Sequence, residues 1–149
     1  MTFFVTFTFV KKLAVFLLLL APVPVAGQSD VIGKWKSVDE NSGEPKSIVE
    51  LTERKGKLFG KILRIFPKPG EDPDPTCEKC PDTRLHQKIV GMEIITDMAL
   101  DGDAWSGGSI LDPEAGKIYS CKLWIENNSL KVRGYSWPFY RTQTWERVP

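Results

Sequence analysis

The sequence predicts an all-β protein, an eight-stranded antiparallel up-and-down barrel that follows an N-terminal signal peptide. Turn-forming residues recur about every 8 to 12 residues, and short runs rich in β-branched and aromatic residues lie between them. After residue 27, no stretch long enough for a helix shows helical periodicity. Eight sequential strands with short turns most simply close into a barrel, because closure removes the exposed edges; an open sandwich is the alternative.

The signal peptide is predicted from residues 1–27, which contain no acidic residue. Two consecutive lysines, Lys11 and Lys12, precede an apolar run at 13–20, and small residues follow up to Ala26. This order of positive charge, apolar run and small residues is typical of a secretory signal. The run is shorter than the roughly 20 residues that a membrane span requires. We expect cleavage near Ala26 or Gly27, a periplasmic or secreted location, and no stable membrane insertion afterwards.

Residues 28–149 are long enough for one barrel domain and no more. Loss of residues 1–27 removes two of the 20 Lys and Arg and none of the 19 Asp and Glu, so the formal charge changes from +1 to −1. A nucleic-acid-binding domain would favour a basic face. The formal charge of −1 therefore argues against a nucleic-acid-binding function, and also against attraction of the domain to anionic lipid.

The first half of the domain contains four candidate strands separated by polar or glycine-containing segments. The polar stretch 39–45 separates the first two, and a turn at Lys55 and Gly56 separates the next two. The fourth run could also hold a helical turn. We expect these strands at residues 31–38, 47–52, 57–66 and 89–96.

The second half shows the clearest alternation. Within 117–126, one face holds Tyr119, Cys121, Leu123 and Ile125, whereas Ser120, Lys122 and also Trp124 lie opposite. Such alternation is typical of antiparallel strands with one buried face. Asn127 and Asn128 suit a two-residue hairpin, because Asn tolerates positive φ. We expect these strands at residues 104–111, 117–126, 130–135 and 140–148.

Several motifs spread over the domain resemble those of one family. They are Gly33-Lys-Trp35, Phe66-Pro-Lys-Pro-Gly-Glu-Asp72, Cys77-Glu-Lys-Cys80, Asp101-Gly-Asp-Ala-Trp-Ser-Gly-Gly108, Gly116-Lys-Ile-Tyr-Ser-Cys-Lys-Leu-Trp124, Leu130-Lys-Val-Arg-Gly-Tyr135 and Arg141-Thr-Gln-Thr-Trp145. On these residues the sequence resembles the domain-of-unknown-function family 2147 (DUF2147), a group of small exported bacterial proteins. The resemblance implies an exported protein and a fold, but it does not imply a particular activity. The chain departs from the family at Ser136-Trp-Pro-Phe-Tyr140, where a smaller, more aliphatic stretch is usual.

The pair Gly33 and Trp35 resembles the N-terminal signature of lipocalin-like barrels. That resemblance implies that Trp35 plugs the closed end and stacks under an arginine of the last strand. Because the first and last strands of such a barrel pair antiparallel, we expect Arg147 to be that partner, ahead of Arg141. We expect this group to be structural and to touch no ligand, since a cation–π stack needs no ligand to be favourable.

Cys77 and Cys80 lie in a Pro-rich, acidic stretch at 67–87 and allow three interpretations. We favour a structural disulfide, because an oxidising compartment would join two thiols this close. A redox pair is the second, although the surrounding acids should raise the thiol pKa. The third is a zinc site in which His86 and Cys121 complete a Cys₃His set. We predict no metal and no cofactor.

The most plausible function is binding of a small apolar or amphipathic molecule inside the barrel. We expect Trp137, Phe139 and Tyr140 to cover an opening, and Arg64, Arg133 or Arg141 to meet an anionic head group. Arg64 shares strand parity with Ile62, which predicts an inward guanidinium. No nucleophile–base arrangement is supported, so we expect no enzymatic activity. The alternative is a structural or protein-interaction module of the cell envelope, without a ligand cavity and with an envelope protein as its partner.

Overall fold

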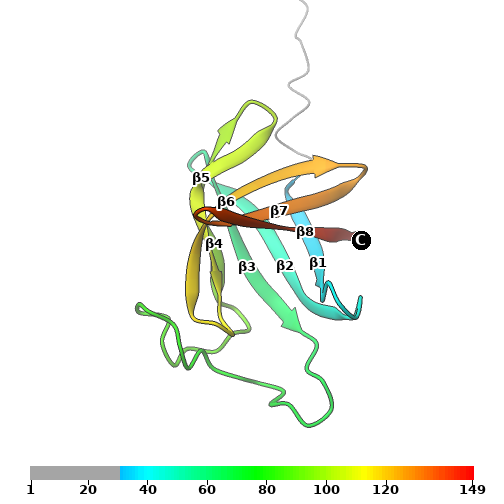
Figure 1. The fold of residues 1–149 in the computed structure, drawn as a ribbon, viewed down its shortest axis with the longest axis vertical. Helices are drawn as coiled ribbons and strands as arrows, with labels where there is room; N and C mark the ends of the chain where they lie inside the picture. Colours follow the sequence, from blue (N-terminus) through cyan, green and yellow to red (C-terminus); the bar gives the residue numbers. More distant parts are fainter. Residues whose placement is uncertain (1–30) are drawn as a thin grey trace, which may run out of the picture.

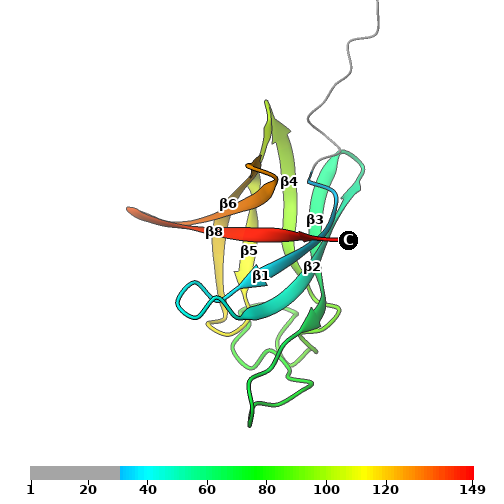
Figure 2. The same ribbon diagram turned by 90° about the vertical axis from the view of Figure 1, so that its right-hand side faces the viewer.

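A computed structural model describes residues 31–149, so the predicted signal peptide at 1–27 lies outside the described residues. Eight strands follow one another, each antiparallel to the next, and the first pairs with the last to close a barrel (Figures 1 and 2). The strands are β1 (Gly33–Val38), β2 (Pro45–Arg54), β3 (Lys57–Ile65), β4 (Glu93–Asp101), β5 (Ala104–Asp112), β6 (Lys117–Glu126), β7 (Ser129–Ser136) and β8 (Phe139–Val148). The predicted fold class is confirmed.

The predicted strands are all present, and the clearest difference lies before β4. Residues 89–92 form a turn, with Gly91 donating its N–H to the carbonyl of Ile62 and Ile62 donating to that of Met92. Ile89 and Met92 are nevertheless buried, because this turn packs against the end of the barrel. Their apolar character therefore reflects packing rather than a strand. Within residues 31–149, no helix has the length and apolar character needed to cross a bilayer.

One end of the barrel is closed by Trp35, which has no exposed surface. Its Nε1–H donates to the carbonyl of Val31 at 2.7 Å. Trp35 lies opposite Arg147 in the β1–β8 register, and the guanidinium carbon of Arg147 is 4.2 Å from the centre of the indole. The stack predicted from the pairing of the first and last strands is present. Gly33, with φ +129°, leaves room beside it for the guanidinium.

A bulge bends β5. In β5, the pairing with β6 shifts between Trp105 and Gly108, and Gly107 has φ +76°. A Cβ on Gly108 would lie 2.1 Å from the carbonyl oxygen of Thr96, so β4 and β5 can approach this closely only at a glycine. These glycines therefore permit a bend in the barrel wall.

The longest connection, residues 66–92, runs across the end of the barrel opposite the β4–β5 turn (green in Figure 1). Cys77 and Cys80 form a disulfide within it and are both buried. The connection rests on the β5–β6 turn at Gly116, where a Cβ would lie 2.0 Å from the carbonyl oxygen of Lys79. Backbone therefore packs on backbone at this point, which fixes the disulfide turn against the barrel.

Candidate functional site: a cavity at the open end of the barrel

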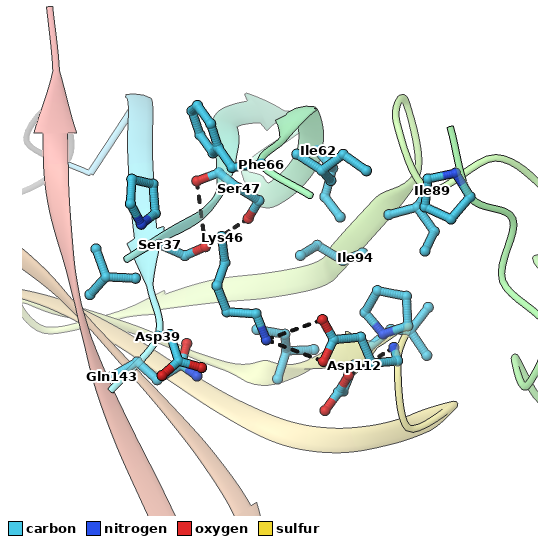
Figure 3. A pocket seen from close by; sticks show the side chains of 18 of the residues that line it. Ser37, Asp39, Lys46, Ser47, Ile62, Phe66, Ile89, Ile94, Asp112 and Gln143 are labelled. Carbon is cyan, nitrogen blue, oxygen red and sulfur yellow. Dashed lines mark hydrogen bonds and ion pairs between the residues drawn. The ribbon is translucent and has the colours of Figure 1, made fainter. Parts of the chain in front are cut away.

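The end opposite Trp35 opens into a cavity of about 1070 Å³. Residues from all eight strands line its wall or rim. The connection 66–92 forms part of the mouth (Figure 3). Proteins hold small molecules in clefts of roughly 300–1,000 Å³. This cavity, measured with its mouth, therefore has the size of a ligand site rather than of a packing defect.

The inner wall of the cavity is apolar. Its buried lining side chains come from β3, β4, β5, β7, β8 and the turn before β4, and they are Ile62, Ile94, Leu111, Val132, Trp145 and Ile89. These side chains also belong to the main hydrophobic core. The wall is thus continuous with the core, and apolar surface of a bound molecule would be removed from water there.

Two pairs of polar side chains interrupt this wall. The hydroxyls of Ser37 and Ser47 lie 2.7 Å apart, on neighbouring positions of β1 and β2 (Figure 3). Gln143 accepts a hydrogen bond at Oε1 from Nε1–H of Trp145, at 2.9 Å. The amide nitrogen of Gln143 carries two further N–H donors. The cavity therefore offers a few fixed polar groups in a mainly apolar surround.

The rim is charged, with more acids than bases. The basic lining residues are Lys46, Lys68, Lys79 and Arg141, and the acidic ones are Asp39, Glu44, Glu71, Asp72, Glu78, Asp112 and Glu114. Lys46 is paired with Glu114 at 3.2 Å (Figure 3). Asp39 accepts backbone N–H groups of Asn41 and Ser42, which lowers the pKa of its carboxyl.

Arg141 lies at the rim but is already paired. Its Nη2 is 2.5 Å from a carboxylate oxygen of Glu40, and its Nε–H donates to the same oxygen at 2.6 Å. Hydrogen bonding to Glu40 raises the pKa of Arg141, which keeps the guanidinium charged. An anionic head group would have to compete with Glu40 for it.

The structure brings together only part of the predicted ligand-binding set. Phe139, Tyr140 and Arg141 line the cavity mouth. Trp137 is 94% exposed at the tip of the β7–β8 hairpin and does not line the cavity. Arg64 and Arg133 also lie outside it.

The inward orientation expected for Arg64 is wrong, and a bulge explains why. The β2–β3 pairing shifts at this point: Val49 pairs with Ile62, whereas Ile48 pairs with Arg64, so Leu63 is an extra residue. One extra residue sends every following side chain to the other face. Arg64 is therefore exposed, and its guanidinium carbon lies 4.7 Å from the ring centre of Phe66.

Arg133 lies on the outer face of the barrel. Its guanidinium carbon is 5.0 Å from the ring centre of Trp124 and 4.4 Å from that of Tyr140. Its Nε–H donates to the hydroxyl of Thr142 at 2.7 Å. Alternation along β7 places Arg133 on the face opposite the buried Leu130 and Val132, so strand parity alone excludes its side chain from the cavity.

The zinc interpretation is wrong for the structure described. Cys77 and Cys80 are bonded to each other, and Cys121 is a buried free thiol on β6. His86 is exposed, with Nδ1 3.2 Å from the carboxylate of Glu78. Across residues 31–149, no three His, Cys, Asp or Glu side chains gather in a way that could hold a metal ion.

Sequence reasoning missed the polar groups of the wall. Ser37, Ser47 and Gln143 each lie on an inward position of a strand, so the alternation that identified apolar core positions could also have identified them. Gly134 was missed as well. A Cβ on it would meet Tyr119 at 3.5 Å, so this glycine leaves space in the cavity that a larger side chain would occupy.

Comparisons with known proteins agree with the fold. The chain is similar in structure to protein HP1028 from the human pathogen Helicobacter pylori, which is described as belonging to the lipocalin family. The two are 21% identical, with a TM-score of 0.67 over 80% of this chain and 83% of that one. This likeness shows a lipocalin-like barrel. Among curated proteins, no relative matches. A family model described as "Uncharacterized protein conserved in bacteria (DUF2147)" matches residues 33–147, and the chain therefore belongs to the DUF2147 family.

Proposed function

We propose that this protein is exported to the periplasm or secreted, and that it binds one small apolar or amphipathic molecule in the barrel. The observation that carries the proposal is the cavity of about 1070 Å³, open at one end and walled by buried core side chains. The N-terminal segment 1–27 supports export through its order of lysines, apolar run and small residues.

The geometry gives the bound molecule a direction. The closed end is filled by Trp35 beneath Arg147, so entry is from the rim. The apolar part of the ligand would lie deep, against Ile94 and Trp145, and its polar part would lie at the charged mouth. Gln143 and the Ser37–Ser47 pair can hydrogen-bond a single polar group partway down.

We propose binding rather than catalysis. Among the described residues that line the cavity there is no histidine and no cysteine. The two serine hydroxyls bond to each other, and within the described residues neither is hydrogen-bonded to a side chain that could act as its general base. The alternative of a solid interaction module assumes a filled barrel, and the cavity argues against that assumption.

The test is to fill the cavity from inside. Gly134→Leu places a side chain in the space beside Tyr119, where the backbone tolerates a Cβ. Ser120→Leu adds the same side chain on the exposed outer face of the neighbouring strand and is the matched control. We expect Gly134→Leu to weaken binding of the neutral apolar dye N-phenyl-1-naphthylamine at least tenfold, with Ser120→Leu close to wild type.

Fatty acids, fatty alcohols and fatty amines of equal chain length should displace the dye from wild type, and their order reports the preferred head group. Thermal unfolding of both variants is the control that each is folded. Dye binding that is equal in all three proteins, or absent from wild type, would reject the cavity as a ligand site.

A further inference from the structure

The tip of the β7–β8 hairpin exposes three aromatic side chains, which we name the aromatic tip: Trp137, Phe139 and Tyr140. Their exposed fractions are 94%, 75% and 63%. Isolated apolar side chains on a surface are ordinary, but a contiguous exposed group of this kind marks an interaction site. The aromatic tip therefore needs a partner that covers it.

The aromatic tip is presented on an ordered hairpin. Ser136 pairs with Phe139 and Tyr135 with Tyr140 in the β7–β8 ladder. The rings of Tyr135 and Tyr140 lie 6.2 Å apart. The hairpin projects from the side of the barrel, so the tip is a convex point rather than a flat face (Figure 2).

The outer face beside the tip is cationic. Lys122 of β6 is opposite Arg133 of β7 in the register, and among residues 31–149 neither forms an ion pair. Together with Trp124 they line a shallow hollow of about 180 Å³, in which Asp103 is the acid. The formal charge of −1 after residue 27 therefore hides a local asymmetry.

The connection 66–92, below the barrel in Figure 1, is nearly balanced in charge. It carries five acids and four bases, which are Glu71, Asp72, Asp74, Glu78 and Asp82 and Lys68, Lys79, Arg84 and Lys88. Two of these acids are paired within the connection, Asp74 with Lys88 and Asp82 with Arg84. Attraction to an anionic surface beside the tip would therefore come from Lys122 and Arg133.

We propose that the aromatic tip, with Lys122 and Arg133, docks this protein peripherally on an anionic phospholipid bilayer. Tryptophan and tyrosine favour the membrane–water interface, because each has an apolar ring and a polar atom. Lysine and arginine beside them meet anionic lipid head groups. A narrow projecting tip suits insertion between head groups, whereas a standard protein–protein interface uses about 20–30 residues on each side.

Docking in this way has a consequence for the cavity. Phe139 and Tyr140 belong both to the tip and to the mouth. A tip seated in a bilayer would hold the mouth next to lipid, where an amphipathic molecule could pass between the two. This consequence rests on the proposed function, whereas the docking itself does not.

The experiment measures binding of the purified protein to vesicles by sedimentation. Vesicles of phosphatidylcholine alone are compared with vesicles that also contain phosphatidylglycerol. We expect binding to the anionic vesicles, a blue shift of tryptophan emission, and weakening as salt is raised.

Two variants, each compared with a control variant, locate the surface. Trp137→Ser combined with Phe139→Ser should weaken vesicle binding at least tenfold, while Leu85→Ser, at a side chain 43% exposed on the connection 66–92, should not. Lys122→Gln should weaken it severalfold, and Lys57→Gln, at the closed end, should leave it unchanged. Thermal unfolding confirms that each variant is folded.

Equal binding to neutral and anionic vesicles, no binding to either, or equal losses in the tip and control variants would each overturn the proposal. Self-association that the tip variant abolishes, without vesicle binding, would overturn it in favour of a protein interface. Gly134→Leu separates the two proposals, because it should lose dye binding and keep vesicle binding.

Discussion

Trp35 and Arg147 show how one residue pair closes the barrel. Arg147 is largely exposed, yet it lies over an indole that has no exposed surface, so its guanidinium shields the ring from water. The pair joins the two ends of the domain through the β1–β8 register. Because the cavity opens at the other end, we expect the role of this pair to be structural.

Removing this stack should cost stability and leave the cavity intact. For Arg147→Ala we expect a loss of about 1 kcal/mol in the free energy of unfolding, the size of an exposed cation–π contact. Arg147→Lys should retain part of it. Urea denaturation measures the loss, and dye binding should be unchanged in both variants. An unaltered unfolding midpoint in Arg147→Ala would show that the stack is not stabilising.

Cys121 illustrates a thiol that packing makes inert. It is the free cysteine among the described residues, and burial raises the pKa of its thiol to about 12. Because thiolate is the reactive form, alkylation at pH 8 should be negligible in the folded protein. We expect one thiol per chain to react after unfolding without reductant, as counted by mass spectrometry. Labelling of the native protein, or of three thiols, would contradict the pairing of Cys77 with Cys80.

At the scale of elements, the connection 66–92 depends on a few contacts for its shape. The disulfide turn packs on Gly116, and an isolated bridge joins Thr76 to Lys88. Arg84 adds a further tie, since it pairs with Asp82 and donates to the carbonyl of Glu93 at 3.0 Å. A long connection is thereby held as one side of the cavity mouth.

Gly116 should be the most sensitive of the turn glycines. In Gly116→Ala, the new Cβ clashes with the backbone of Lys79. The alanine is also strained, because φ at this position is +67°. Gly102→Ala is the matched control, because its φ is +65° and nothing lies within 4 Å of its Cβ position. The control should lose about 1 kcal/mol in the free energy of unfolding, from backbone strain alone.

We expect Gly116→Ala to lose more than this, and to speed reduction of the Cys77–Cys80 disulfide by dithiothreitol. Equal losses of stability and equal reduction rates in the two variants would show that the disulfide turn does not depend on this contact.

Asp82 makes the connection sensitive to acid. Hydrogen bonds from Arg84 lower the pKa of its carboxyl from 3.8 to about 2. A carboxyl whose pKa is lowered by folding stabilises the protein at pH values above its pKa in the unfolded chain. That stabilisation is lost as the pH falls through about 2. The melting temperature of wild type should therefore fall more between pH 4 and pH 2 than that of Asp82→Asn. Parallel curves for the two proteins would contradict this.

The sequence predicts the strands well because turns and alternation are local signals. All eight strands follow from them. The disulfide follows instead from two closely spaced cysteines in a chain with an expected oxidising compartment, and the stack of Arg147 on Trp35 is what the resemblance to lipocalin-like barrels implies. The position of Arg64 does not follow from alternation, because the extra residue Leu63 in β3 has no local signature and reverses the parity after it. The docking of Lys79 on Gly116 joins residues far apart in the chain, so neither residue alone predicts it.

At the scale of the whole molecule, the barrel has two unlike ends. One is sealed by Trp35, and the other opens into the cavity, whose lining includes residues of the connection 66–92 and of the β7–β8 hairpin. The aromatic tip lies on the hairpin at this open end. The proposed small-molecule site and the proposed membrane surface therefore share one end of the barrel.

The most direct test of the account is to observe where an apolar molecule binds. Isoleucine methyl groups report this by nuclear magnetic resonance, because Ile62, Ile94 and Ile110 line the cavity whereas Ile32 and Ile118 are exposed outside it. On titration with N-phenyl-1-naphthylamine, the account predicts saturable shifts at the three cavity methyls and none at the two outer ones. Shifts confined to Ile32 or Ile118, or no shift at the solubility limit, would contradict it.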